Sequence, residues 1–343
     1  MHPIPSVSVV IPAYNHERFV GEAIASVQAQ TLREFELIVI DDGSRDATAS
    51  IAESMAAGDA RIRVLRQPNG GSHAAINRGM ALSRAPWIAI LNSDDRHHPE
   101  RLARMIEAAG DGHDFAVSDA RLIDADGAPI TDPSHWWLKA NREAREYARA
   151  HGPIDGLLHG NYTVSTSNFL IRRSLAQAIG PMRPRRHILD WDYALRAALH
   201  APRRFLYLQD RVLFDYRIHG RNAILADMAR GAAEIGHLHR QLMPRLGAPP
   251  GLVSALFRAQ RDLRRHARAN GAALRAAEVS SLTGALASLG EEAQRLRTDC
   301  AKAERIAHER EADRRALEAE LAQMRSSLAW RVLRRLGLTG TRR

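Results

Sequence analysis

The fold of this chain is decided by the stretch LIVIDD at residues 37–42, where four apolar residues run directly into two carboxylates. A short apolar run that ends in polar residues is typical of a central parallel strand covered by helices on both faces. The pattern returns in WIAILNSDD at residues 87–95. Open α/β sheets bind ligands at the carboxyl ends of their strands, so we expect both acidic pairs at one edge. A nucleotide together with a divalent cation would satisfy four carboxylates there.

Strand and helix patterns alternate along the first part of the chain. Strands are expected at 7–11, 37–40, 62–65 and 87–91, and helices at 17–30, 46–57 and 72–82. This alternation predicts an α/β protein with a doubly wound, mostly parallel, Rossmann-like sheet. After residue 123 the pattern is less regular, with strands expected at 163–171 and 212–218 and a helix at 190–200.

Composition limits the class of protein. The 343 residues carry a formal net charge of +10, and arginine supplies nearly all of the cationic charge. Cys300 is the single cysteine, which excludes an intramolecular disulfide and a Cys-based zinc cluster. The N-terminus does not resemble a signal peptide, and no run approaches the roughly 20 apolar residues that span a bilayer. We therefore expect a cytoplasmic protein, with attachment to the inner face of the plasma membrane left open.

Seven short motifs follow one another in a fixed order: VVIPAYN at 9–15, IDDGS at 40–44, NGG at 69–71, NRG at 77–79, LNSDD at 91–95, LDWD at 189–192 and YRIH at 216–219. Together they resemble family 2 glycosyltransferases of the bacterial surface-polysaccharide type, over residues 7 to about 222. The resemblance implies a GT-A fold, a nucleotide-sugar donor, a divalent cation (Mn²⁺ or Mg²⁺) and inversion at the anomeric carbon.

The resemblance also implies roles for individual residues. Asp42 is expected to accept a base N–H, and Asp94 to contact the ribose. Asp95 and His219 are expected to hold the metal ion. Asn92 departs from the acidic residue usual at the start of the Asp-x-Asp motif, which places more of the metal binding on Asp95. The full expected nucleotide-binding set is Pro12, Tyr14, Asp41, Asp42, Asn69 and Asp94.

Inverting transfer needs a general base that takes the proton of the acceptor hydroxyl. Asp190, at the start of an expected helix, resembles the base of the family. The acidic residue that often precedes this base is replaced here by Leu189, which should lessen elevation of the Asp190 pKa by like charge. Asp192 is the rival candidate.

The C-terminal third reads as helical and divides into a helical extension at 223–288, a candidate coiled coil at 289–328 and a basic amphipathic tail at 329–343. Apolar residues at alternating spacings of three and four predict a coiled coil and a homo-oligomer. One long amphipathic helix that folds back on its own domain is the alternative. The tail suits an anionic membrane surface, and a solvated terminus is the alternative.

The leading functional hypothesis is transfer of a sugar from a nucleotide-diphosphate donor, with a UDP-sugar favoured, to a glycan or polyprenyl-linked acceptor. A nucleotidyltransferase and a catalytically inactive scaffolding relative are the alternatives. The helical region also carries an arginine stripe, which would suit nucleic acid. Because no nucleic-acid-binding motif accompanies that stripe, we expect no nucleic-acid partner.

Overall fold

The computed structural model describes residues 4–219 and, beyond them, residues 234, 237, 238, 241, 295, 298, 302, 310 and 313–320. The chain divides into two compact units, Met1–Leu286 and Ala287–Arg343. The boundaries expected after residues 222, 288 and 328 lie outside the described residues, as do the basic tail and most of the heptad pattern. In the second unit, residues 313–320 are helical and exposed.

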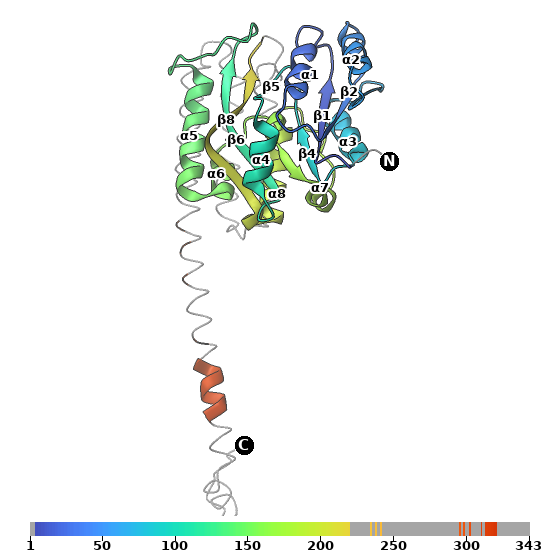
Figure 1. Ribbon diagram of the computed structural model, residues 1–343. Coiled ribbons are helices and arrows are strands. Elements are labelled where there is room, and N and C mark those ends of the chain that lie inside the picture. The colour runs from blue at the N-terminus through green and yellow to red at the C-terminus, as the bar shows by residue number, and fades with distance from the viewer. Residues whose placement is uncertain are drawn as a thin grey trace, which may run out of the picture. The chain divides into compact units, whose positions relative to one another are not determined.

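The first unit contains a mixed sheet of eight strands in the order β3-β2-β1-β4-β7-β6-β8-β5 (Figure 1). The four strands expected from the first 91 residues are β1 to β4, and they pair in parallel. Strand β7 breaks the parallel pattern, because it runs antiparallel to both of its neighbours, β4 and β6. The strand bounds are β1 (Val7–Ala13), β2 (Phe35–Asp41), β3 (Ile62–Arg66), β4 (Trp87–Ile90), β5 (Arg96–His97), β6 (Phe115–Ile123), β7 (Leu170–Arg172) and β8 (Phe205–Arg217).

Helices connect the strands and cover the sheet. The strand expected at 163–171 is wrong over most of its length, because a 3-10 turn at Thr166–Asn168 comes before the short β7. That turn is stabilised by polar side chains that a sequence pattern does not reveal. The helix bounds are α1 (Val20–Gln28), α2 (Thr48–Ala57), α3 (Ser72–Leu82), α4 (Arg101–Ala109), α5 (Trp136–His151), α6 (Pro153–His159), α7 (Arg173–Ile179) and α8 (Leu189–His200), with a second 3-10 turn at Pro202–Arg204.

Alternating side chains along β2 face two different hydrophobic cores. Leu37 and Val39 pack in the core that α1, α2 and α4 cover. Ile38 and Ile40 face α3, where they meet Ala75. All four side chains are fully buried. Because both faces of the strand are covered, β2 has the continuous apolar run expected of a central parallel strand.

Helix α3 lies very close to β1. A Cβ atom added at Gly79 would come within 2.2 Å of Val10 Cγ1, which is far inside van der Waals contact. Only glycine permits this approach of helix and strand. The close approach packs α3 against β1, and residues 67–71 lead directly into this helix.

The carboxyl ends of β1 and β2 lie together, since Ala13 pairs with Asp41 in the parallel register. Strand β4 pairs in parallel with the other side of β1, with Val10 opposite Ile90.

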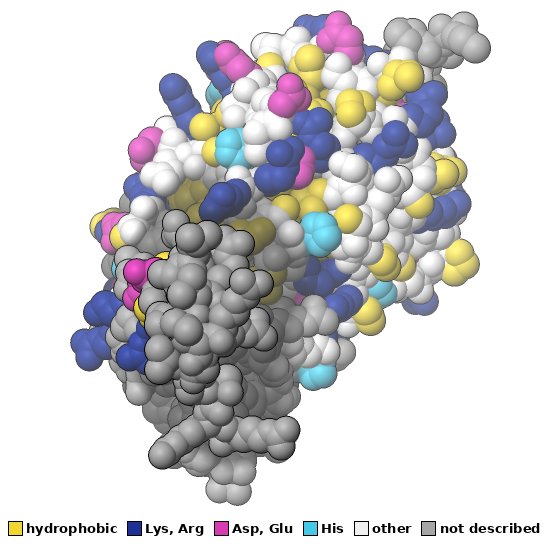
Figure 2. Space-filling model, turned by 90° about the horizontal axis from the view of Figure 1, so that it is seen from below, with side chains coloured by type: hydrophobic (Ala, Val, Ile, Leu, Met, Phe, Trp, Pro, Cys, Tyr) yellow, Lys and Arg dark blue, Asp and Glu magenta, His cyan; other side chains and the backbone are white. Residues whose placement is uncertain are grey.

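None of the helices in the described ranges is long and apolar enough to cross a bilayer. On the face shown in Figure 2, Lys and Arg side chains are interspersed with apolar and acidic ones.

Candidate active site

Asp42 organises the loop between β3 and α3. Its Oδ1 accepts hydrogen bonds from the Gln67 side chain at 2.7 Å and from Gly70 N–H at 2.9 Å. Its Oδ2 accepts from Gly71 N–H at 2.8 Å. Asn69 Nδ2 donates to the Asp42 carbonyl at 3.0 Å. The buried carboxylate therefore holds residues 67–71 against the end of β2, where they can border a bound nucleobase.

The remaining expected nucleotide-binding residues stand at the ends of β1 and β2. Pro12 pairs with Ile40 across the two strands. Tyr14 follows β1 with 42% of its surface exposed, so its ring can stack on a planar ligand. Asp41 is buried and accepts from Ser44 N–H at 3.3 Å, whereas its Oδ1 has no hydrogen-bond partner among the described residues.

Asn92 anchors the turn before β7. Its backbone N–H donates to Ser167 Oγ, its Nδ2 donates to Ser165 Oγ, and its Oδ1 accepts from the Thr166 hydroxyl, each at 2.9 Å. An amide can donate and accept at once, which a carboxylate cannot do. The asparagine at this position is therefore explained by the turn that it holds.

Asp95 lies in the interior of this network. It is 1% exposed, its Oδ2 accepts from Ser167 Oγ at 2.6 Å, and its Oδ1 accepts from Arg217 N–H at 2.9 Å. Burial, and then the negative charge of Asp94, raise the pKa of Asp95 well above its usual value. Protein donors occupy both oxygens, so this carboxyl group ties β8 to the end of β4.

Asp94 and His219 form the other half of the acidic pair. His219 Nε2 lies 3.0 Å from Asp94 Oδ2, and the two side chains are 7% and 13% exposed, respectively. Burial alone would raise the pKa of Asp94, but the hydrogen bond to His219 and the charges of His16 and His219 lower it. Asp94 is therefore held as a carboxylate.

His16, Asp94 and His219 form a group of donors that fits a divalent cation, called here the metal-competent group. One ligand atom from each of His16, Asp94 and His219 lies within 4.8 Å of the other two. Imidazole nitrogen and carboxylate oxygen are both common ligands of divalent metal ions. The roles expected from the sequence, Asp95 on the metal and Asp94 on the ribose, remain predictions, and the donor group found among the described residues contains Asp94 and not Asp95. The two histidines lie next to Asp94, whereas Asp95 faces Ser167 and the backbone of β8.

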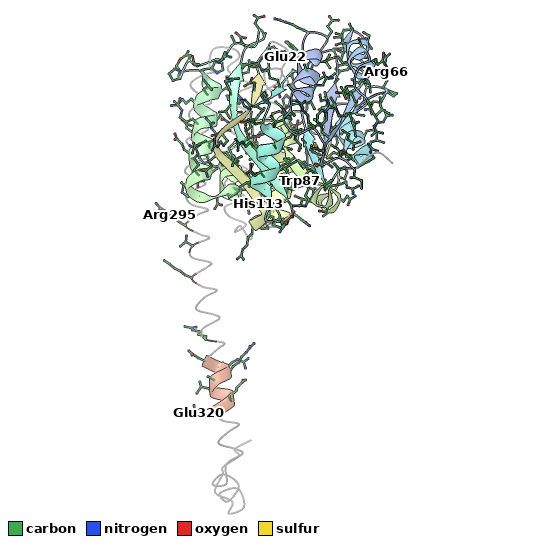
Figure 3. All side chains as sticks on the ribbon, viewed as in Figure 1. Glu22, Arg66, Trp87, His113, Arg295 and Glu320 are labelled. Carbon is green, nitrogen blue, oxygen red and sulfur yellow. The ribbon has the colours of Figure 1, made fainter. Side chains whose placement is uncertain are left out.

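Arg217 is buried next to the acidic pair and holds the backbone of Asp94. It is 1% exposed, its guanidinium donates to the carbonyl of Asp94 at 2.8 Å, and it forms an ion pair with Glu22 of α1. Glu22 stands at the upper edge of the sheet in Figure 3. A guanidinium enclosed in this way fixes the backbone between Asp94 and β8, and is not directed at a phosphate.

Asp190 is the second residue of α8, and the Asn161 side chain orients its carboxyl group. Asn161 Nδ2 donates to Asp190 Oδ2 at 2.8 Å, and Asn161 Oδ1 accepts from the Thr163 hydroxyl at 2.6 Å. Burial raises the pKa of Asp190 to about 6, although the bond from Asn161 opposes this rise. Leu189 in place of an acid thus leaves a raised pKa, because burial rather than like charge is its source. A carboxylate with a pKa near neutrality suits general-base chemistry.

Asp192, the rival base, is engaged elsewhere. It is fully buried, and its two oxygens pair with Arg183 at 3.4 Å and with Arg196 at 3.0 Å. Both oxygens of this buried carboxylate are therefore engaged by arginine side chains. Asp190 has no such ion pair among the described residues, and it stays the predicted base.

Tyr216 lies near both the acidic pair and Asp190. Burial raises its pKa well above the usual value, and the negative charges of Asp95, Asp94 and Asp190 raise it further. One phenol thus lies within electrostatic range of the acidic pair and of Asp190. Trp137 of α5 stacks on Tyr216, with ring centroids 5.4 Å apart and an interplanar angle of 16°. Trp137 is 6% exposed, so it holds the tyrosine in place rather than presenting a free face.

Several supporting residues were not expected from the sequence. His16 joins the metal-competent group, Asn161 orients Asp190, and Ser167 holds Asp95. His16 carried a usable signal, because it directly follows the VVIPAYN motif at 9–15. Asn161 and Ser167 carried none, because Asn161 lies in an irregular segment and Ser167 lies in a 3-10 turn where a strand was expected.

Comparison with known proteins identifies the family. The family model for glycosyl transferase family 2 matches residues 8–180, about half of the chain. The chain belongs to glycosyl transferase family 2. It is 31% identical to EpsH of Bacillus subtilis (strain 168) over 219 residues, which are 63% of this chain and 61% of EpsH. Its match to the undecaprenyl-phosphate 4-deoxy-4-formamido-L-arabinose transferase of Pseudomonas aeruginosa (strain LESB58) is 39% identical over 122 residues, which are 34% of this chain and 36% of that protein.

The chain thus spans less than two thirds of these family 2 relatives. Among solved structures, it is similar to the mannosyltransferase PcManGT from Pyrobaculum calidifontis in complex with GDP-Man and Mn²⁺. The TM-score is 0.55 at 17% identity, and the match covers 83% of this chain and 81% of that structure. This likeness supports a GT-A-like mixed α/β fold for the first unit, as the sequence motifs led us to expect.

Proposed function

We propose that this family 2 member is an inverting glycosyltransferase that uses a nucleoside-diphosphate sugar and a divalent cation. One arrangement carries the proposal. The ionised Asp94, with two imidazoles beside it, and the raised-pKa carboxyl of Asp190 both lie within electrostatic range of Tyr216. These groups supply the two needs of the reaction, a site for the departing diphosphate and a base for the incoming hydroxyl.

The donor nucleotide would lie along the carboxyl ends of β1 and β2. Tyr14 is exposed there, and the loop held by Asp42 forms the neighbouring wall. Asp94 and His219 would hold the cation, which when bound would neutralise the negative charge of the diphosphate. The role assigned to Asp95 is to position β8, and with it His219, relative to Asp94. UDP as the nucleotide remains a prediction.

Asp190 would take the proton of the acceptor hydroxyl as its oxygen attacks the anomeric carbon from the side opposite the nucleotide. Asn161 leaves one oxygen of Asp190 without a described side-chain donor, while it fixes the orientation of the carboxyl group. A pKa of about 6 makes Asp190 ionised at neutral pH and still basic enough to accept a proton.

The acceptor is proposed as a glycan or a lipid-linked glycan of surface-polysaccharide synthesis. One relative is named as acting on undecaprenyl phosphate, which supports a lipid-linked acceptor for this chain as well. Peripheral attachment to the inner face of the membrane through residues 329–343 and oligomerisation through 289–328 remain predictions from the sequence.

The test uses the full chain with a panel of UDP-, GDP- and dTDP-sugars, in Mn²⁺ or in EDTA. We expect slow release of nucleoside diphosphate from one donor, and saturable donor binding that depends on the cation. Asp94→Asn should weaken binding of that donor by about tenfold or more, since metal sites are sensitive even to their supporting groups. The matched control is Asp111→Asn, because the Asp111 side chain is fully exposed. Donor binding that is indifferent to EDTA and to Asp94→Asn would refute the proposal.

A further inference from the structure

The metal-competent group draws its donors from three separate segments. His16 lies in the loop between β1 and α1, Asp94 lies between β4 and β5, and His219 follows β8. One donor atom from each lies within 4.8 Å of the other two. Ligands on opposite sides of a metal ion are about 4.2 Å apart when each bond is about 2.1 Å. The three donors are thus close to the spacing that one ion requires.

His16 is held in this position by its backbone and by its ring. Asn15, directly before it, has a φ of 52°, and asparagine tolerates this left-handed conformation better than most residues do. His16 N–H donates to Thr48 Oγ1 at 2.7 Å, which ties the loop to α2. The ring Nδ1 lies 2.8 Å from Ser93 Oγ, in the residue next to Asp94. The imidazole is therefore anchored on both sides.

Phe19 supports both histidine rings. Its ring centroid is 6.0 Å from that of His16 and 5.0 Å from that of His219. The two imidazoles meet edge to face at 5.6 Å and 90°. Phe19 is 8% exposed, and the Arg217 guanidinium lies 5.0 Å from its ring centroid. An enclosed aromatic ring that packs against both ligands limits their rotation, which is the usual function of groups around a metal site.

We propose that His16 is a third protein ligand of the cation, and that the site therefore prefers a transition-metal ion such as Mn²⁺, Co²⁺ or Zn²⁺ to Mg²⁺ or Ca²⁺. This inference rests on the proposed function, in which Asp94 and His219 hold the cation. Imidazole suits transition metals, whereas Mg²⁺ and Ca²⁺ prefer oxygen ligands. Two imidazoles and one carboxylate give this chain a donor set with more nitrogen than oxygen, and the diphosphate supplies oxygen from the substrate side.

The first experiment counts imidazoles on the metal. The full chain is loaded with Mn²⁺ alone, and electron spin-echo envelope modulation reports the coordinated nitrogens. We expect two imidazoles in the wild type, and one in each of His16→Asn and His219→Asn. The Asn amide can keep a contact with Ser93, so His16→Asn removes the proposed ligand with little change to the loop. The control is His113→Asn, since Figure 3 places His113 at the end of the sheet opposite Glu22.

The second experiment measures selectivity by calorimetric titration of the nucleotide-free protein with Mn²⁺ and with Mg²⁺. The wild type should bind Mn²⁺ at least about tenfold more tightly than Mg²⁺. His16→Asn should lose about tenfold or more in Mn²⁺ affinity with a smaller change for Mg²⁺, and His113→Asn should match the wild type. One imidazole in the wild type, or equal Mn²⁺ affinity in His16→Asn and wild type, would overturn the proposal.

These outcomes separate the inference from the proposed function. If His16 only pairs with Asp94 and Ser93, the wild type shows one imidazole on Mn²⁺ while cation-dependent donor binding persists. If the enzymatic proposal fails instead, no nucleotide sugar binds, yet the imidazole count still reports on His16. The spectroscopic readout needs no substrate, so neither result depends on the other.

Discussion

Replacing Asp190 by Asn tests the base and the origin of its pKa in one variant. The pKa rises from an ordinary 3.8 to about 6 because the carboxyl is buried. This difference of about 2 units corresponds to roughly 3 kcal/mol, at 1.36 kcal/mol per unit. In the wild type, the rate of transfer should rise tenfold per pH unit up to about pH 6 and then level off. Asp190→Asn should lower the plateau by about 10²- to 10⁴-fold, the usual contribution of a general base.

The same shift predicts an effect on stability with a definite sign. A carboxyl whose pKa is higher in the folded state destabilises the fold as it ionises. That cost is absent below about pH 3.8 and fully present above about pH 6. Asp190→Asn should therefore gain up to roughly 3 kcal/mol relative to the wild type between pH 4 and pH 8. Urea denaturation across this pH range measures the gain.

The matched control is Asp126→Asn, because Asp126 is an exposed carboxylate paired with Arg18 on the surface. Asn161→Ala adds a directional test, since its hydrogen bond lowers the Asp190 pKa and its loss should move the acid limb of the rate profile to higher pH. The reasoning is refuted if Asp190→Asn keeps the wild-type rate. It also fails if the acid limb in Asn161→Ala stays in place or moves to lower pH.

Three further predictions concern the surroundings of the site. Asp42→Ala should lower the free energy of unfolding by about 2–4 kcal/mol, because it leaves two backbone N–H groups of the 67–71 loop without their acceptor. Urea denaturation measures the loss, and a value below about 0.5 kcal/mol contradicts this prediction. Gly79→Ala should lower the free energy of unfolding by about 1–3 kcal/mol, because the added methyl group would overpack against Val10. Gly58→Ala should cause no such loss, because the nearest described atom to its added Cβ is 3.8 Å away. Equal denaturation midpoints for the two variants would refute the contrast. Asp95→Asn should retain Mn²⁺ affinity within about threefold while Asp94→Asn does not, because the Asp95 carboxyl is bound to Ser167. If calorimetry shows the larger loss of Mn²⁺ affinity in Asp95→Asn, Asp95 is the ligand.

Prediction from the sequence succeeded where local pattern and burial coincide. The run at 37–40 predicted a central strand because both of its faces are covered, and β2 has that position. It failed where long-range contacts set the local structure. The 3-10 turn at Thr166–Asn168 replaces an expected strand because Asn92, from a distant segment, binds its side chains. A pattern read along one segment contains no information about a partner more than seventy residues away.

The sequence by itself determined the family, the parallel half of the sheet and the candidate base, because strand-end acids and ordered motifs are local features. Only the tertiary structure decided which partners Asp94 and Asp95 have. The side chains of adjacent residues after a strand point in different directions. The Asp94 carboxylate therefore faces His219, whereas the Asp95 carboxyl group faces Ser167 and the backbone of β8. The surroundings of each side chain, and hence its pKa and its partners, depend on segments that the fold alone brings together.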